Sequence, residues 1–140
     1  MRFVYQEVIT LTLGLAGLVT LVGCAGNSAG YTQSGEELTP QITLIEGDHQ
    51  TTAINTPFAT PLKIRFNKNG MALPGHVINF YAPETGPSGT FKDWTNTVSV
   101  ETDASGYATA PIFTANGNAG SVIVRAWNGP YSSEFHLTIQ

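Results

Sequence analysis

The sequence predicts an all-β fold, a sandwich of about seven antiparallel strands between residues 41 and 140. Three observations indicate it. Short runs of alternating apolar and polar residues recur, clusters of Gly, Pro, Asn and Asp separate them, and no stretch has the period of an amphipathic helix. Strand and turn signals at this spacing are typical of a sandwich or barrel. The only cysteine is Cys24, so we predict a sandwich without a disulfide.

The first three predicted strands are 41–46, 62–66 and 76–81. The second of them alternates most cleanly, and we expect Leu62, Ile64 and Phe66 to face the core. A tight turn follows it at 67–70, because the sequence Asn-Lys-Asn-Gly supplies residues that tolerate positive φ.

The remaining four strands are predicted at 95–101, 107–112, 121–128 and 133–139. A Pro- and Gly-rich loop precedes the first of these, and Asp103 begins a type I turn that Gly106 closes before the second. Seven strands in about 100 residues match the count of an immunoglobulin-like sandwich. The residues expected to face the core from these strands are Val98, Val100, Ala108, Ala110, Ile112, Val122, Val124, Ala126, Phe135, Leu137 and Ile139.

Near the N-terminus, residues 8–22 form an apolar run of secretory length, too short for a typical membrane-spanning helix. The run leads through Gly23 into Cys24. With this ending, residues 1–23 resemble a bacterial lipoprotein signal peptide. The resemblance implies cleavage after Gly23 and diacylation of the Cys24 thiol, and a thiolate is a good nucleophile for such a transfer. The alternative is an ordinary cysteine in a leader.

Residues 24–40 are small and polar, and we predict a lipidated N-terminus followed by a flexible tether to a domain at 41–140. Two or more acyl chains anchor a protein stably, and a coil of this length spans ~20 Å. The domain is therefore expected close to a membrane surface. In Gram-negative bacteria, a residue such as Ala25 after the cysteine is associated with export to the outer membrane.

Five phrases in the predicted domain follow one another in a characteristic order. They are Phe58-Ala59-Thr60-Pro61-Leu62, Asn69-Gly70 with Pro74-Gly75, Phe80-Tyr81-Ala82-Pro83, the segment from Thr102 to Pro111, and Thr114-Ala115-Asn116 with Ala119-Gly120. Together they resemble the group 1 bacterial immunoglobulin-like domain of intimin and invasin type. The resemblance spans nearly all of 41–140 and implies a disulfide-free β-sandwich of the kind used in surface adhesins. Members of that family usually stand in tandem arrays, whereas this chain has one copy, so a long stalk would need other chains.

Composition and motifs argue against several functions. Six Lys and Arg stand against ten Asp and Glu, for a net charge of -4, whereas nucleic-acid binding needs clustered cations. No Gly-x-Ser-x-Gly elbow or phosphate-binding glycine loop occurs. The three histidines lack metal-ligand spacing, and Asp103 is better explained as a turn residue than as a calcium ligand. We therefore predict no enzymatic activity, cofactor or metal.

Outward-facing aromatic residues are the best candidates for a binding site. If the third, sixth and seventh predicted strands share a sheet, its outer face collects Tyr81, Arg125, Trp127 and His136. Trp, Tyr and Arg are enriched in binding hot spots, and aromatic faces also stack on sugar rings. The alternative is that these side chains form cross-strand pairs that stabilise the sheet, with His136 simply solvated.

The expected strand pairing places Arg125 between Asn79 and His136, and Trp127 near Val77 and Glu134. Two other residues are given structural roles. His76 is expected at the rim of the core, partly covered. Trp94, beside the Pro- and Gly-rich loop, is expected to cap the core together with Phe91.

The predicted function is that of a non-catalytic lipoprotein of the bacterial envelope, with one immunoglobulin-like module that acts in adhesion or binds surface proteins. Two alternatives remain, a carbohydrate-binding module for envelope glycans and an accessory subunit of an envelope complex. The expected partners are thus the membrane, through the lipid, and a protein or a glycan.

Overall fold

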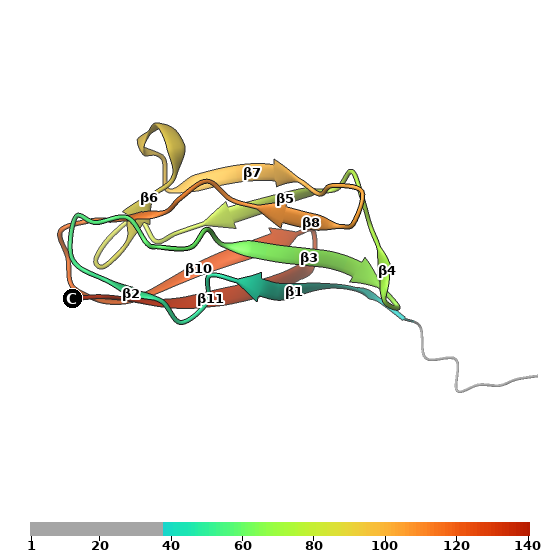
Figure 1. The fold of residues 1–140 in the computed structure, drawn as a ribbon, viewed down its shortest axis with the longest axis horizontal. Helices are drawn as coiled ribbons and strands as arrows, with labels where there is room; N and C mark the ends of the chain where they lie inside the picture. The colour runs from blue at the N-terminus through green and yellow to red at the C-terminus, as the bar shows by residue number, and fades with distance from the viewer. Residues whose placement is uncertain (1–37) are drawn as a thin grey trace, which may run out of the picture. The chain divides into compact units, whose positions relative to one another are not determined.

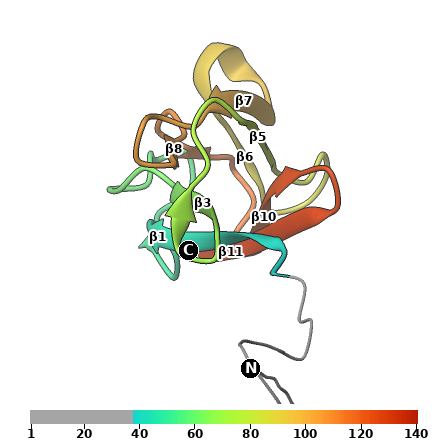
Figure 2. The same ribbon diagram turned by 90° about the vertical axis from the view of Figure 1, so that its right-hand side faces the viewer.

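The computed structural model describes residues 38–140, in which two larger β-sheets pack face to face (Figures 1 and 2). The predicted all-β sandwich is confirmed. The predicted signal peptide, Cys24 and the tether up to residue 37 lie outside the described residues. In the described part of the chain, no helix is both long enough and apolar enough to cross a membrane.

The first sheet is built around β3 (Lys63–Lys68). It pairs antiparallel with β1 (Pro40–Glu46), β4 (Met71–Ala72) and β8 (Tyr107–Thr109). The second sheet has five strands in the order β2 (Thr51–Thr52), β11 (Tyr131–Ile139), β10 (Gly120–Asn128), β5 (Val77–Tyr81) and β7 (Thr97–Glu101). Its pairs are antiparallel except β2 with β11, which is parallel.

A small third sheet closes one end of the sandwich. It pairs β6 (Gly89–Thr90) with β9 (Thr114–Ala115), and the short 3-10 helix η2 (Lys92–Trp94) follows β6 (Figure 1). The sandwich is immunoglobulin-like: the hairpin β10–β11, extended by β5 and β7, faces a sheet of β1, β3 and β8. Figure 2 looks along the strands and shows these two layers.

Seven of the strands have three residues or more, and they correspond to the seven predicted strands. The predicted ends agree to within two residues except in β8, which stops at Thr109 rather than at residue 112. The two-residue strands β2, β4, β6 and β9 were not predicted, because so short a segment shows no alternation.

The core lies between the sheets, and most of the expected core residues are there. Leu62, Ile64 and Phe66 are buried, and so are the expected residues of β10 and β11. Val98 and Val100 are partly buried and pack against the core.

Ile112 is the exception among the expected core residues. It is 40 % exposed, whereas its neighbour Phe113 is 1 % exposed. The reason is Pro111, which lacks the N–H needed to continue the β8 ladder. The alternation therefore stops after Ala110, whose N–H still donates to the Leu62 carbonyl at 2.9 Å.

A buried hydroxyl ties two chain segments at one end of the sandwich. The Thr102 Oγ1 accepts a hydrogen bond from the His76 N–H at 2.9 Å and donates one to the Leu73 carbonyl at 2.7 Å. Thr102 is buried, so both backbone groups depend on this hydroxyl.

Replacing this residue, Thr102→Val, is expected to lower the free energy of unfolding by about 1–3 kcal/mol, because the shape is kept and two partly buried backbone groups lose their partner. Urea denaturation followed by circular dichroism measures the change. The matched control is Thr109→Val on β8, where the side chain is exposed. Equal stability losses in the two variants would contradict the assigned role of Thr102.

Candidate functional site

The outer face of the five-stranded sheet carries the predicted site. Alternate residues of β5, β10 and β11 point away from the core, and the register aligns them in rows. Arg125 stands between Tyr81 of β5 and Glu134 of β11. In the next row, Trp127 stands between Asn79 and Ser132.

This register corrects the predicted one by two residues on each side of β10. Arg125 does not lie between Asn79 and His136, and Trp127 pairs with neither Val77 nor Glu134. The physical reason is the β10–β11 turn. Asn128 already pairs with Tyr131, so two residues suffice to connect the strands, whereas the predicted last strand began at residue 133.

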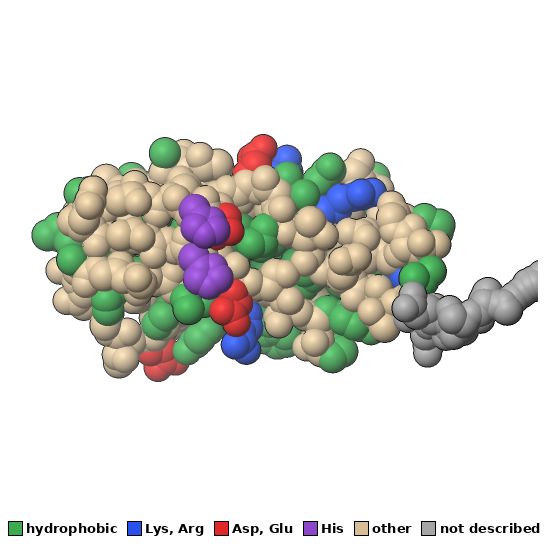
Figure 3. Space-filling view, turned by 90° about the horizontal axis from the view of Figure 1, so that it is seen from below, with side chains coloured by type: hydrophobic (Ala, Val, Ile, Leu, Met, Phe, Trp, Pro, Cys, Tyr) green, Lys and Arg blue, Asp and Glu red, His purple; other side chains and the backbone are tan. Residues whose placement is uncertain are grey.

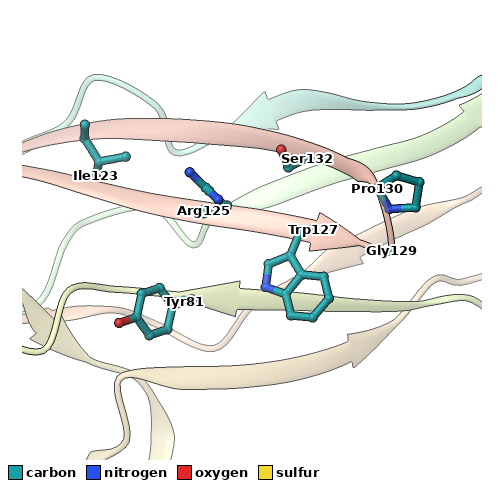
Figure 4. A pocket seen from close by; sticks show the side chains of 7 residues that line it. All are labelled: Tyr81, Ile123, Arg125, Trp127, Gly129, Pro130 and Ser132. Atoms are coloured by element: carbon teal, nitrogen blue, oxygen red, sulfur yellow. The ribbon is translucent and has the colours of Figure 1, made fainter.

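A groove of about 560 Å³ crosses this face near the turn (Figure 4). Tyr81 and Trp127 stand beside each other on neighbouring strands and remain 42 % and 39 % exposed. The volume falls within the roughly 300–1,000 Å³ of small-ligand sites. The groove, called the outer-sheet groove below, is lined by Tyr81, Ile123, Arg125, Trp127, Gly129, Pro130 and Ser132.

Local structure fixes the position of the groove. The Asn128 side-chain amide donates to the Val77 carbonyl at 2.8 Å and so ties the end of the β10–β11 hairpin to β5. Gly129 has a φ of 57° and turns the chain toward Pro130, which forms one wall. Trp127 is thereby held over a well-connected sheet rather than on a loose loop.

Arg125 is held by an ion pair that leaves most of its donors available. Its Nη2 lies 3.3 Å from Oε2 of Glu134, and both side chains are half-exposed. Exposed pairs of this kind contribute only ~0–1 kcal/mol. We therefore assign this pair to orienting the guanidinium, whose other N–H groups can bind a carboxylate or carbonyl in the groove.

His136 lies on the same sheet face but does not line the outer-sheet groove. It is exposed, and its ring stacks on that of His49 with centroids 6.0 Å apart; the histidine pair is visible in Figure 3. The Asp48 carboxylate accepts the His136 backbone N–H at 2.7 Å and lies 3.0 Å from His49 Nδ1. Among residues 38–140, no group of three His, Cys, Asp or Glu side chains could hold a metal ion.

Asp103 has its predicted structural role, whereas His76 is more exposed than predicted. The Asp103 Oδ1 accepts the N–H groups of Ser105 and Tyr107 at 2.8 and 3.0 Å, which confirms a turn-forming role. His76 lies at the rim next to β5 and is exposed, while its ring meets the edge of the Phe66 ring at 5.3 Å. Neither residue lines the outer-sheet groove.

Trp94 contradicts its expected role. Phe91 is buried and caps the core, but Trp94 is 86 % exposed and does not. Both Asp93 and Trp94 have left-handed backbone conformations, with φ of 63° and 62°. Asp is one of the residue types that adopt this conformation, but nothing in the sequence signals it at a tryptophan, and Trp94 was therefore missed as a candidate binding residue.

The outer-sheet groove thus combines an indole, a phenol, an aliphatic side chain and an oriented guanidinium on a rigid sheet. Such a set can bury an apolar side chain of a partner and pair with a neighbouring acceptor. No family model, no curated protein and no solved structure was found to match this chain.

Proposed function

We propose that this protein is a non-catalytic lipoprotein of a bacterial envelope whose immunoglobulin-like domain binds a partner protein, in adhesion or in surface protein binding. The observation that carries the proposal is the outer-sheet groove, where Tyr81, Arg125 and Trp127 meet. These three residue types are those most enriched at the centres of protein interfaces. Their partial exposure leaves apolar area that binding would remove from water.

The sequence supports the rest of the proposal. The apolar run ending in Cys24 supports a lipid anchor, and the residue after it, Ala25, supports an outer-membrane address in a Gram-negative cell. Although no family model matches, the five phrases that resemble group 1 bacterial immunoglobulin-like domains support a role related to adhesion. Assembly as a subunit of an envelope complex would use the same groove.

Trp127→Ala is expected to reduce partner binding by at least about 30-fold, which corresponds to a hot-spot loss of ~2 kcal/mol. The cost in stability should stay near the ~0.2–1 kcal/mol of a cross-strand pair, because Trp127 stands on the outer face of the sheet. The experiment places a photo-crosslinking amino acid at position 123, in the groove, in cells that express the full chain. The crosslinked partner is then identified and purified, and its affinity is measured for the natural protein and for the Trp127→Ala variant.

The same crosslinker at position 109, on the other sheet, controls for non-specific capture, and Trp94→Ala is the matched tryptophan control. We expect a protein adduct from position 123 that disappears in Trp127→Ala and persists in Trp94→Ala. If the Trp127→Ala variant loses several kcal/mol of stability but still forms the adduct, Trp127 stabilises the sheet and does not bind the partner.

A further inference from the structure

Trp94 is the most exposed of the large hydrophobic side chains in residues 38–140, at 86 %. A buried indole would remove some 150–250 Å² of surface from water, and because Trp94 is exposed its indole does not contribute this stabilisation to the fold. Three nearby rings, those of Phe91, Phe113 and Phe80, pack together in the core instead. The position of Trp94 therefore needs an explanation other than folding.

A constrained loop holds the indole outward. The Phe91 N–H donates to the Thr95 carbonyl at 2.7 Å and closes the loop, and the Phe91 ring is anchored 4.8 Å from that of Phe113. Within the loop, two consecutive residues, Asp93 and Trp94, take left-handed φ values, which Asp tolerates but a bulky residue such as Trp adopts at a cost. Strain of this kind persists where the surrounding structure enforces it, often at binding sites.

Two adjoining hollows border Trp94, with volumes of about 510 and 360 Å³. Gly89, Thr90, Trp94 and Asn116 line both of them. Pro83, Glu84, Ser88, Thr95, Asn96 and Thr97 complete the first hollow, and Asn55, Thr114 and Ala115 complete the second. Trp94 and these two hollows are called the Trp94 platform below. Their combined extent suits a ligand longer than one small ring.

The polar groups of the Trp94 platform divide into two kinds. The Asn116 amide is structural: Oδ1 accepts the Ser88 N–H at 3.3 Å and Nδ2 donates to the Gly86 carbonyl at 2.9 Å. By contrast, the hydroxyls of Thr90 and Thr114, which are paired across β6 and β9, have no hydrogen-bond partner within residues 38–140. The Asn55 side-chain amide likewise has no partner in this part of the chain. These groups remain available to a ligand.

We propose that the Trp94 platform binds a neutral glycan of several sugar units. A pyranose ring presents an apolar C–H face, which suits the electron-rich face of an exposed indole. Its hydroxyl edge both donates and accepts hydrogen bonds, as do the threonine hydroxyls and the asparagine amide at the platform. The combination of one aromatic plane with convergent neutral polar groups matches this chemistry.

The charges at the platform favour a neutral glycan over an anionic one. Among the residues that line the two hollows, Glu84 is the only ionisable one, and neither lysine nor arginine is present. A sulfated or acidic sugar in the hollows would meet the Glu84 carboxylate, whereas the one cation of the loop, Lys92, does not line them. The apolar side chains among the lining residues are those of Pro83, Trp94 and Ala115, and Trp94 supplies the one aromatic face.

The Trp94 platform is separate from the outer-sheet groove, with which it shares no lining residue. It lies at the end of the sandwich that carries β6 and η2, opposite the end at which the described chain begins (Figure 1). The glycan proposal does not depend on the proposed protein partner, and each can fail alone.

The test uses the full chain, purified in a detergent without a sugar headgroup. In the Trp127→Phe variant, Trp94 is the only tryptophan of the chain, so its fluorescence reports the platform directly. Cellohexaose, maltohexaose and hexa-N-acetylchitohexaose are the probes, followed by a printed array of neutral glycans. We expect a saturable blue shift with at least one neutral glycan.

Variants then assign the binding to the platform. Trp94→Ala is expected to weaken glycan binding by roughly tenfold or more, with the thermal midpoint unchanged because the side chain is exposed. The double variant Thr90→Val, Thr114→Val should also weaken it, and Trp127→Ala should not. The proposal is overturned if no neutral glycan binds, if only an anionic probe such as a heparin hexasaccharide binds, or if Trp94→Ala binds as well as the natural protein.

Discussion

Phe113→Ala is expected to lower the free energy of unfolding by about 3–5 kcal/mol, the usual cost of removing a fully buried phenylalanine. The Phe113 ring lies 4.8 Å from the Phe91 ring and 5.8 Å from the Phe58 ring, centroid to centroid. Removing the Phe113 ring leaves a cavity between the Phe91 and Phe58 rings, and these two rings cannot both move to fill it. For a domain stabilised by only ~5–15 kcal/mol, this is a large share.

Ile112→Ala is the control for this prediction, since the neighbouring side chain is 40 % exposed and should cost less than about 1 kcal/mol. Chemical denaturation of both variants, followed by circular dichroism, gives the two free energies. If Ile112→Ala were the more damaging change, the chain would run through β8 and β9 with the opposite phase, and the assignment of the core at this end would be wrong.

The same pair of residues shows where prediction from the sequence stopped. In β10, in β3 up to Phe66 and in β11 from Phe135 the alternation holds, and it correctly predicted buried residues such as Ile64, Val124 and Leu137. After Ala110 the alternation still favoured Ile112. Only the three-dimensional path shows that the strand ends before Pro111 and that the next buried side chain is Phe113.

For the candidate site, the sequence correctly predicted the face of the sheet but not which residues are neighbours on it. Parity along a strand decides which face a residue occupies, so Tyr81, Arg125 and Trp127 were correctly placed on one face. Which residues are neighbours on that face depends on the register, and the register depends on the length of the β10–β11 turn. The sequence Asn-Gly-Pro-Tyr allowed more than one length, and the predicted neighbours were off by two residues.

The exposure of Trp94 could not be predicted from alternation or register. Its exposure follows from two consecutive left-handed residues, Asp93 and Trp94, and these depend on the loop closure between Phe91 and Thr95. The neighbours that border it, Asn55, Thr90 and Thr114, come from three separate segments of the chain. A platform assembled in this way carries no local motif.

Cys24→Ala is expected to abolish lipidation of the chain. The natural protein should incorporate labelled palmitate and lose residues 1–23, whereas the variant should incorporate none, because the thiol is the proposed acyl acceptor. Each buried CH₂ of an acyl chain contributes ~0.8 kcal/mol to membrane binding, so two or more chains account for stable anchoring. Ala25→Ser is the control and should be labelled normally. Labelled palmitate on the Cys24→Ala chain would disprove the lipoprotein assignment.

Protease treatment of intact cells then connects the proposed anchor with the two proposed binding sites. If the domain of the natural protein is digested without lysis, the outer-sheet groove and the Trp94 platform are open to the exterior, and neutral glycans outside the cell become the relevant ligands. If the domain is protected from the protease until the envelope is permeabilised, it lies inside the envelope, and partners of both sites should be sought there. If residues 24–40 form the tether that the sequence predicts, a coil of that length spans only ~20 Å, and either outcome would then keep those partners close to the membrane that holds the proposed lipid.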